Sequence, residues 1–434
     1  MKKSYEELRS SLTMDGLVKD IRSFFQDLPD HRASNAKYDL EDVLMSGFAM
    51  FSLKHPSLLD FEQQNHIEQE NLRQIFGIKE LCTDAQMRNI LDEVDPNKLR
   101  GFYPQQLQLL QKTGLRREYH FWKKHILLSI DGVEHFRSGK IHCDRCLCKT
   151  HQNGEKSYSH SMLCAVLVHP DQREVFVAGM EPITNEDGEQ KNDCERNAAK
   201  RLLDWLSEAY QDQCFILVED ALYANGPHIK QIQSNQWQYI LNVKPKSHKT
   251  LFKLFETRRQ QQATHSYSLK ENGVEHRFEW SNNMPLNDTH ADLRVNFLHY
   301  EQIDKKGKVT KFTWISSIPL NKRNVYQIMR AARARWKIEN ETFNTLKNQG
   351  YHFEHNYGHG KNYLATVLAY LMLLAFLIDQ IYQRCNKLFQ KIWLKTKTKA
   401  KLWRGLRSIF HVYPINSFKE LYVKLAFLYQ IQLE

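Results

Sequence analysis

The sequence predicts an α/β protein in which a mixed sheet is flanked by a helical N-terminal domain and a basic, helical C-terminal region. Two observations carry this prediction. Short apolar runs typical of buried strands occur with helical patterns between residues 119 and 245, whereas residues 1–118 look helical throughout. At 434 residues, 41% of them hydrophobic, the chain has room for two or three domains with sizeable cores.

The charge and the cysteines indicate a partner and a compartment. A formal net charge of +11 favours a polyanionic partner, nucleic acid before a membrane surface. The N-terminus lacks the apolar core of a signal peptide, so the eight cysteines are expected to be reduced thiols in a cytoplasmic protein. The longest apolar run, residues 364–378, is too short to span a bilayer, and we expect a core helix and no membrane association.

The N-terminal region, residues 1–118, contains one clear helix start. Thr83–Gln86 is a capping box that predicts a helix to about Val94. A helical stretch before it gives the spacing of a helix-turn-helix that binds DNA ends, in which Gln86, Arg88 and Asn89 would face a DNA groove. An ordinary helical hairpin explains the same pattern.

The predicted catalytic domain begins at residue 119. Its first strand, His125–Asp131, has the continuous apolar run of a strand buried on both faces and ends in Asp131-Gly132. Open α/β sheets place their ligands at the carboxyl ends of such strands, although Asp-Gly is also a common turn dipeptide. A second strand of this kind, Cys214–Asp220, also ends in acid.

The other elements of residues 119–245 define the fold class. Strands are predicted at 159–169, 174–182 and 237–244, and helices at about 191–210 and 225–234. Three strands in succession, followed by alternating helix and strand, match the ribonuclease-H-like fold.

A cysteine pair lies between the first two strands. Cys143 and Cys146 have the Cys-x-x-Cys spacing of a zinc knuckle, and Cys194, His142 or His160 could complete a tetrahedral site. A structural Zn²⁺ is therefore a candidate ligand. Because a second Cys-x-x-Cys pair is missing, unliganded thiols on a hairpin are the alternative.

Residues 246–320 differ from the sheet region. Short strand-like runs alternate with basic clusters and no helix-length periodicity is evident, so we expect a β-rich insertion. Basic residues near its start are candidate phosphate contacts or ordinary surface charges: Lys244, Lys246, Lys249, Arg258 and Arg259.

The catalytic domain resumes over residues 321–383 with a helix predicted at 322–349. At ~100° per residue, Glu339 lies on the apolar stripe of this helix, with Arg335 and Lys347 on its flanks and Glu341 roughly opposite. A carboxylate on an apolar stripe needs a partner. A metal ion and an intrahelical pair with Arg335 are the two alternatives.

The tail, residues 384–434, is the most basic segment. It has eleven Lys or Arg against two Glu, and Lys387, Lys391, Lys395 and Lys399 recur every four residues, as on one helical face. This pattern favours DNA contact, although basic faces are often only solvated.

Three segments together resemble the DDE transposases of bacterial insertion sequences: Asp131-Gly132, Asp220-Ala-Leu-Tyr223 and Arg335-Trp-Lys-Ile-Glu339. The resemblance is to the branch with a β-strand insertion before the catalytic glutamate, and covers roughly residues 119–360. Separations of 220 − 131 = 89 and 339 − 220 = 119 residues suit that architecture.

The sequence departs from this branch in two places. Ala332 stands where the motif has tyrosine, and Leu346 stands where a lysine follows the glutamate by seven residues. A one-residue insertion near residues 340–341 would explain why Lys347 is one position later. It would leave Glu341 as a rival glutamate, and the helical phase favours Glu339.

The resemblance implies metal-dependent DNA cleavage and strand transfer. Asp131, Asp220 and Glu339 would hold two Mg²⁺ (or Mn²⁺) ions, and Arg335 and Lys347 would bind phosphate. The implied partners are double-stranded DNA, as terminal inverted repeats and target DNA, and a second copy in a homodimer. The alternatives are a nuclease of this fold that cuts without joining and a non-catalytic, transposase-derived DNA-binding protein.

Overall fold

The computed structural model describes residue 9, residues 12–185 and residues 191–432, except the side chains of 191–194. Within these ranges, eleven strands form one sheet in the order β3-β4-β2-β6-β7-β11-β10-β9-β8, with β1 on β2 and β5 on β4. The strands are β1 (His120–Trp122), β2 (His125–Ser138), β3 (Leu147–Thr150), β4 (Lys156–Val168), β5 (Phe176–Ile183), β6 (Phe215–Glu219), β7 (Gln238–Asn242), β8 (His265–Glu271), β9 (Val274–Pro285), β10 (Arg294–Ile303) and β11 (Val309–Ser316).

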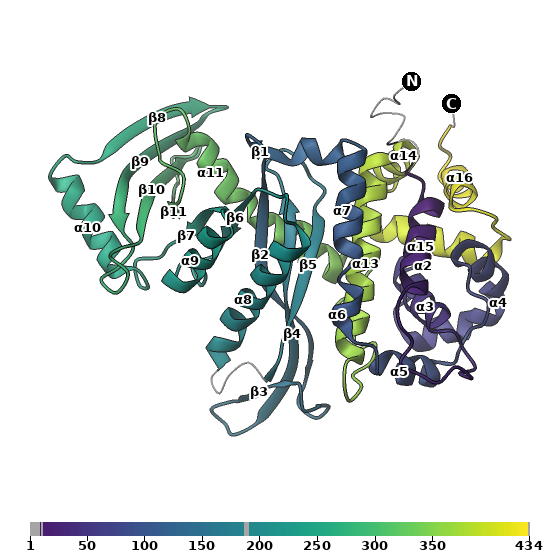
Figure 1. Ribbon diagram of the computed structural model, residues 1–434. Coiled ribbons are helices and arrows are strands. Elements are labelled where there is room, and N and C mark those ends of the chain that lie inside the picture. Colours follow the sequence, from purple (N-terminus) through teal and green to yellow (C-terminus); the bar gives the residue numbers. More distant parts are fainter. Residues whose placement is uncertain (1–8, 10–11, 186–190, 433–434) are drawn as a thin grey trace.

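Helices lie at both ends of the chain and between the strands (Figure 1). Those before the sheet are α2 (Met14–Gln26), α3 (Leu40–Ser52), α4 (Leu58–Phe76), α5 (Asp84–Asp92), α6 (Pro96–Leu99), α7 (Phe102–Lys112) and the 3₁₀ helix η1 (Leu115–Tyr119). The others are α8 (Lys191–Ala209), α9 (Gly226–Ser234), α10 (Lys249–Gln260), α11 (Val325–Ala334), the π-helix η3 (Ile338–Phe343), α12 (Asn344–Asn348), α13 (Leu364–Cys385), α14 (Lys387–Thr396), α15 (Lys399–Val412) and α16 (Phe418–Leu428).

The sheet has the predicted mixed architecture. β2, β4 and β5 pair antiparallel, whereas β6 pairs in parallel with both β2 and β7. The run Ile126–Ile130 of β2 is buried, as expected for a central strand. This mixed α/β sheet with helical N- and C-terminal regions confirms the predicted fold class and is consistent with a ribonuclease-H-like fold.

The insertion extends the same sheet. β11 pairs with β7, and β10, β9 and β8 follow in order, so the predicted β-rich character is confirmed. The expectation of no helix there was wrong, because α10 precedes the strands. Leu251 and Phe255, one turn apart, are the buried residues of α10, and so short an apolar stripe shows no helical period.

The N- and C-terminal helices form one helical body on the side of the sheet away from the insertion (Figure 1). α15 packs on α4 and α16 on α2, and the ring of Phe76 lies 6.2 Å from Phe410 and 5.5 Å from Phe418. The basic tail is therefore part of a packed core.

The predicted lysine face of the tail forms only in part, because Lys387, Lys391 and Lys395 lie exposed at four-residue intervals on α14 and Lys399 does not continue the row. Lys397 adopts a left-handed conformation that ends α14, and α15 starts at Lys399, whose side chain is buried. The recurrence every four residues therefore runs across a helix break, and the four lysines do not share one face.

Helix α13 is the core of the molecule. It contacts β5 and α3, and it extends to 22 residues because polar residues such as Asp379 continue it past the apolar run. The 15-residue apolar run was judged too short to span a bilayer, but the whole helix is long and apolar enough to cross a membrane. The apolar part of the helix is nevertheless buried inside the protein. Lys54 Nζ lies 2.7 Å from Asp379 Oδ2, so this core acid is paired. α13 is thus the core helix of a soluble protein.

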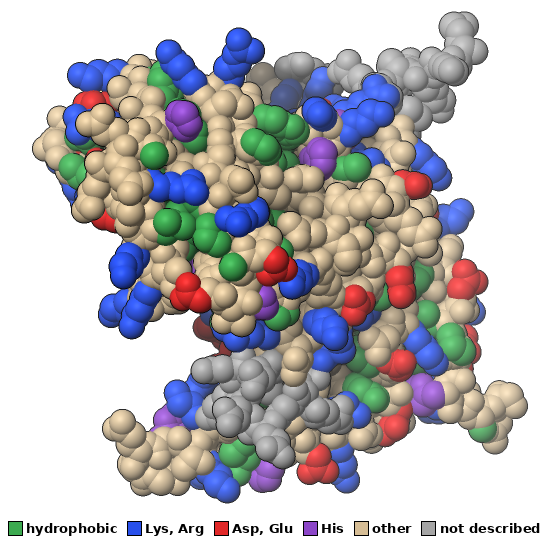
Figure 2. Space-filling model, turned by 60° about the vertical axis from the view of Figure 1, so that its left-hand side comes forward, with side chains coloured by type: hydrophobic (Ala, Val, Ile, Leu, Met, Phe, Trp, Pro, Cys, Tyr) green, Lys and Arg blue, Asp and Glu red, His purple; other side chains and the backbone are tan. Residues whose placement is uncertain are grey.

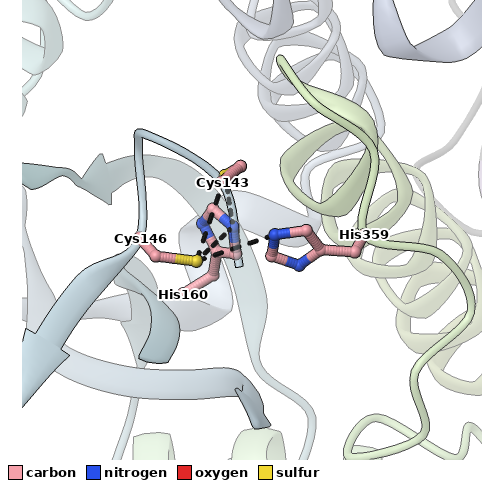
Figure 3. A group of neighbouring side chains, drawn as sticks. All are labelled: Cys143, Cys146, His160 and His359. Atoms are coloured by element: carbon pink, nitrogen blue, oxygen red, sulfur yellow. Dashed lines mark hydrogen bonds between the residues drawn. The ribbon is translucent and has the colours of Figure 1, made fainter. Parts of the chain in front are cut away.

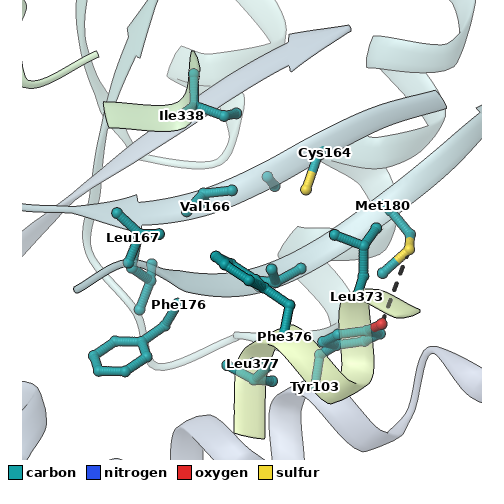
Figure 4. Close-up of a cluster of buried hydrophobic side chains, with 14 of the residues drawn as sticks. Tyr103, Cys164, Val166, Leu167, Phe176, Met180, Ile338, Leu373, Phe376 and Leu377 are labelled. Atoms are coloured by element: carbon teal, nitrogen blue, oxygen red, sulfur yellow. Dashed lines mark hydrogen bonds between the residues drawn. The ribbon is translucent and has the colours of Figure 1, made fainter. Parts of the chain in front are cut away.

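Side chains from both faces of the sheet fix the elements around it. Figure 4 shows Leu373 and Phe376 of α13 on one face of the sheet strands and Ile338 of η3 on the other. All three side chains are at most 1% exposed. Burial of Ile338 anchors the π-helix, and with it the neighbouring Glu339, against the sheet.

Candidate active site

Two aspartates lie side by side where the parallel pairing of β2 with β6 ends. The expectation that the first strand ends at Asp131 was wrong, because β2 continues through Gly132 to Ser138, still paired with β4. The pairing of β2 with β6 places Ser129 opposite Val218, and the same offset places Asp131 opposite Asp220 two residues further on. Because adjacent strands lie about 4.8 Å apart, the two carboxylates belong to one site. The turn after β6 is held by a 2.7 Å hydrogen bond from the Leu222 amide to Asp220 Oδ1.

Glu339 reaches the same site from the π-helix η3, which contacts β2. Nη1 of Arg335 is 2.8 Å from Glu339 Oε1 and 3.3 Å from Asp131 Oδ2. The guanidinium is buried and links the two acids. The predicted intrahelical pair therefore exists, and the same guanidinium joins Glu339 to Asp131. Glu341 instead lies 3.7 Å from Arg173.

The electrostatics of the site favour an added cation. The pKa of Asp131 is raised to about 7, chiefly by burial and in addition by the Glu339 and Asp220 carboxylates, and Arg335 and the Gly132 amide act in the opposite direction. The site thus concentrates negative charge in a partly buried position. Arg335 alone does not fully compensate this charge.

The helix that carries Glu339 is not continuous. The predicted helix 322–349 is divided into α11, the π-helix η3 and α12. A π-helix accommodates one extra residue within a helix and is frequent at functional sites. The six residues Ile338–Phe343 of η3 therefore lie where the sequence suggested a one-residue insertion.

A fourth carboxylate was missed by the sequence analysis. Oε1 of Glu195, on α8, accepts a 2.8 Å hydrogen bond from the buried Tyr223 hydroxyl. A Cβ placed on Gly132 would lie 3.4 Å from the Glu195 carboxylate. Burial and the Asp220 charge raise the pKa of Glu195. Glu195 lies near the start of α8, a polar helix, where no local pattern distinguishes it from the other charged residues.

The expected phosphate ligand Lys347 has another partner, and an exposed tryptophan lies next to Arg335. Lys347 Nζ lies 2.7 Å from Glu354 Oε1, in an ion pair on the segment after the π-helix. Trp336, which follows Arg335 in the chain, is 47% exposed. Its ring lies 6.4 Å from that of Phe312 in the insertion. An exposed aromatic ring therefore adjoins Arg335.

A separate group of thiols and imidazoles lies beside the sheet (Figure 3). Ligand atoms of Cys143, Cys146, His160 and His359 all lie within 4.8 Å of one another. The expectation for His142 was wrong, because its ring stacks on Tyr158 at 4.3 Å, outside this group. The side chain of Cys194 lies outside the described residues. The fourth member, His359, comes from the segment between α12 and α13.

The comparison with known families agrees with this geometry. Residues 143–377, more than half of the chain, match the transposase DDE domain family. The chain belongs to the DDE transposase family. The matched range contains Asp220 and Glu339 and begins after Asp131, which is assigned here from the strand register. No curated protein sequence matches the chain.

DDE transposases bind DNA, and the structure shows which basic residues are exposed. Figure 2 shows Lys and Arg side chains spread over the face that carries the insertion. Lys244, Lys246 and Lys249 are exposed there. The other two candidates of the insertion are held within it: Arg258 donates to Ser281 Oγ at 2.7 Å, and Arg259 pairs with Glu279.

The expected DNA-reading helix, α5, starts with the predicted capping box. The Gln86 side chain closes this box and Arg88 pairs with Asp84, whereas Asn89 is exposed. Two of the three expected reader side chains thus make local contacts. The DNA-reading role of α5 stays a prediction.

Proposed function

We propose that this DDE transposase cleaves DNA at the ends of a bacterial insertion sequence and transfers the cut strands to target DNA. Asp131, Asp220 and Glu339 would bind two Mg²⁺ or Mn²⁺ ions. The observation that carries the proposal is the convergence of these acids from two parallel strands and a π-helix, with Arg335 between Asp131 and Glu339.

The residues of the site fit hard divalent cations. Carboxylate oxygens are the ligands that Mg²⁺ prefers, and three acids, with Glu195 beside them, supply them here. Burial and neighbouring negative charge raise the pKa of Asp131 to about 7, and a cation would relieve this charge. When bound, Mg²⁺ supplies charge stabilisation and an activated oxygen nucleophile for an in-line displacement.

The chain's own cations would hold the DNA backbone. Arg335 now compensates two carboxylates. The planar fork of Arg335 would bind the scissile phosphate in a bidentate manner when bound cations compensate Asp131 and Glu339. Lys347, paired with Glu354 at the surface, would add a point charge by exchanging that partner for a phosphate.

The proposed partners are double-stranded DNA and a second copy of the chain. Joining two ends of one element to a target needs two active sites held together, so we propose a homodimer in the DNA complex. Exposed lysines on the insertion and the C-terminal helices provide phosphate contacts.

The experiment uses the full-length protein and DNA carrying both flanks of its gene. We expect Mg²⁺-dependent cut ends and joined products from the wild type. Asp131→Asn, Asp220→Asn and Glu339→Gln should abolish both while DNA binding persists, because each change removes a metal-binding charge and keeps the shape. Glu341→Gln is the matched control and should remain active.

Three outcomes would overturn parts of this proposal. Cut ends without joined products would indicate a nuclease. Binding without cleavage would indicate a non-catalytic DNA-binding protein. Loss of activity in Glu341→Gln with activity retained in Glu339→Gln would show that the wrong glutamate has been assigned.

A further inference from the structure

The group formed by Cys143, Cys146, His160 and His359 has the dimensions of a tetrahedral metal site. Sγ of Cys143 and Sγ of Cys146 are 3.9 Å apart, and three sulfur–nitrogen distances to the two histidine Nε2 atoms are 3.5, 3.5 and 3.6 Å. A tetrahedron with Zn–S of about 2.3 Å and Zn–N of about 2.0–2.1 Å has S···S edges of about 3.8 Å and S···N edges of about 3.6 Å. The measured edges agree with these values.

The backbone holds these side chains in place. The Cys146 amide donates to the Cys143 carbonyl at 3.1 Å, which closes the Cys-x-x-Cys turn. His160 lies on β4, next to this turn. His359 comes from the segment between α12 and α13 and points its ring at the turn (Figure 3). Its Nδ1 is buried and has no hydrogen-bond partner among the described residues, so Nε2 is the nitrogen directed at the group.

We propose that Cys143, Cys146, His160 and His359 bind one Zn²⁺ ion with a structural role. Two thiolates select a soft or borderline metal over Mg²⁺, and two thiolates with two imidazoles suit zinc. Four protein ligands fill a tetrahedral site and leave no position for water or substrate, which separates this site from the catalytic acids.

The zinc would join the segments that follow two of the three catalytic acids, Asp131 and Glu339. Cys143 and Cys146 follow the strand of Asp131, and His359 follows the helix of Glu339. Cys146 and His359 are 213 residues apart in the sequence. Beside the group, Arg145 stacks on Tyr363 at 4.5 Å and so contacts the same segment. A metal bond between these segments would fix the position of η3 relative to β2.

Metal analysis of the full-length protein tests the proposal. The protein is purified without chelator and without a metal-affinity tag, and zinc is measured by mass spectrometry. We expect about one zinc per chain in the wild type, and loss to background in Cys143→Ser and His359→Asn. Cys148→Ser and His142→Asn change neighbouring residues outside the group and should keep the zinc.

Two further measurements complete the test. The first does not depend on variants that could fail to fold, and the second distinguishes failure of the zinc proposal from failure of the proposed function. Wild-type protein loaded with Co²⁺ in place of zinc should show the strong visible absorption of tetrahedral thiolate-bound Co²⁺. Glu339→Gln should keep its zinc even when it cannot cleave DNA.

Two results would overturn the proposal. Absence of zinc together with absence of the Co²⁺ absorption would leave only a hydrogen-bonded group of thiols and imidazoles. Zinc retained at full occupancy in His359→Asn would exclude His359 as a ligand, and with it the link between the two segments.

Discussion

Replacing Asp131 by Asn should stabilise the magnesium-free protein at high pH. Burial raises the pKa of Asp131 from its ordinary 3.8 to about 7, so folding favours the neutral carboxyl group. The stability contributed by this group is fully present below about pH 4 and is lost as the pH rises through about 7. Asparagine keeps the neutral form at every pH.

The size of the pKa shift of Asp131 determines how much the substitution should stabilise the protein. A shift from 3.8 to about 7 corresponds to about 4 kcal/mol at 1.36 kcal/mol per pKa unit. Because 22% of the Asp131 side chain is exposed, solvent screens part of this free energy, and we expect Asp131→Asn to stabilise the protein by ~2 kcal/mol at pH 8, about half of the full value. With an unfolding entropy of about 2 cal/mol/K per residue over 434 residues, the melting temperature should rise by about 2 °C.

The assay is thermal unfolding of the wild type and Asp131→Asn at pH 5 and pH 8. Magnesium is omitted and no chelator is added, so that any bound zinc stays in place. Asp30→Asn is the control, since its hydrogen bond with Arg32 lowers the pKa of Asp30 and gives the opposite sign. Equal stabilisation at both pH values, or none at pH 8, would refute the reasoning.

Three further changes test other parts of the site. Glu195→Gln should reduce cleavage about 10–100-fold and raise the Mg²⁺ requirement, because an oriented carboxylate beside the metal ligands is lost; unchanged kinetics would make it a packing residue. Deleting Asn340 removes the extra residue of the π-helix and should abolish cleavage while the protein still folds. A deletion variant that cleaves DNA would refute the role of the π-helix in placing Glu339. Changing the exposed Lys391, Lys395 and Lys397 to Gln should flatten the slope of log affinity against log salt by roughly 0.9 per lost phosphate contact, and an unchanged slope would exclude them.

Local patterns were sufficient for the sheet and for the placement of the acids. A buried apolar run and the acid after it are both read from adjacent residues, so Asp131 and Asp220 were singled out from the sequence, and the register of β2 and β6 places them opposite each other. The predicted strand end at Asp131 was wrong, because the pairing with β4 carries β2 on to Ser138. The helical phase of α11 still applies at Glu339, because Glu339 is only the second residue of the π-helix η3. Helical phase was therefore sufficient to place it.

Features that depend on long-range contacts were not predictable. His359 joins Cys146 across 213 residues, and no local pattern marks it as a neighbour of the cysteines. Glu195 gains its position from contacts with Tyr223 and Gly132, which lie on other elements. The lysines of the tail follow a regular spacing, but α14 ends at Lys397, whose left-handed backbone conformation separates it from α15.

The central claim is that the three acids form one metal site, and anomalous diffraction from crystals soaked with Mn²⁺ tests it most directly. We predict Mn²⁺ peaks bound by oxygen atoms of Asp131, Asp220 and Glu339, and their disappearance in Asp220→Asn. Mn²⁺ bound by Glu341, or an acid site without any Mn²⁺ at saturating concentration, would contradict the account.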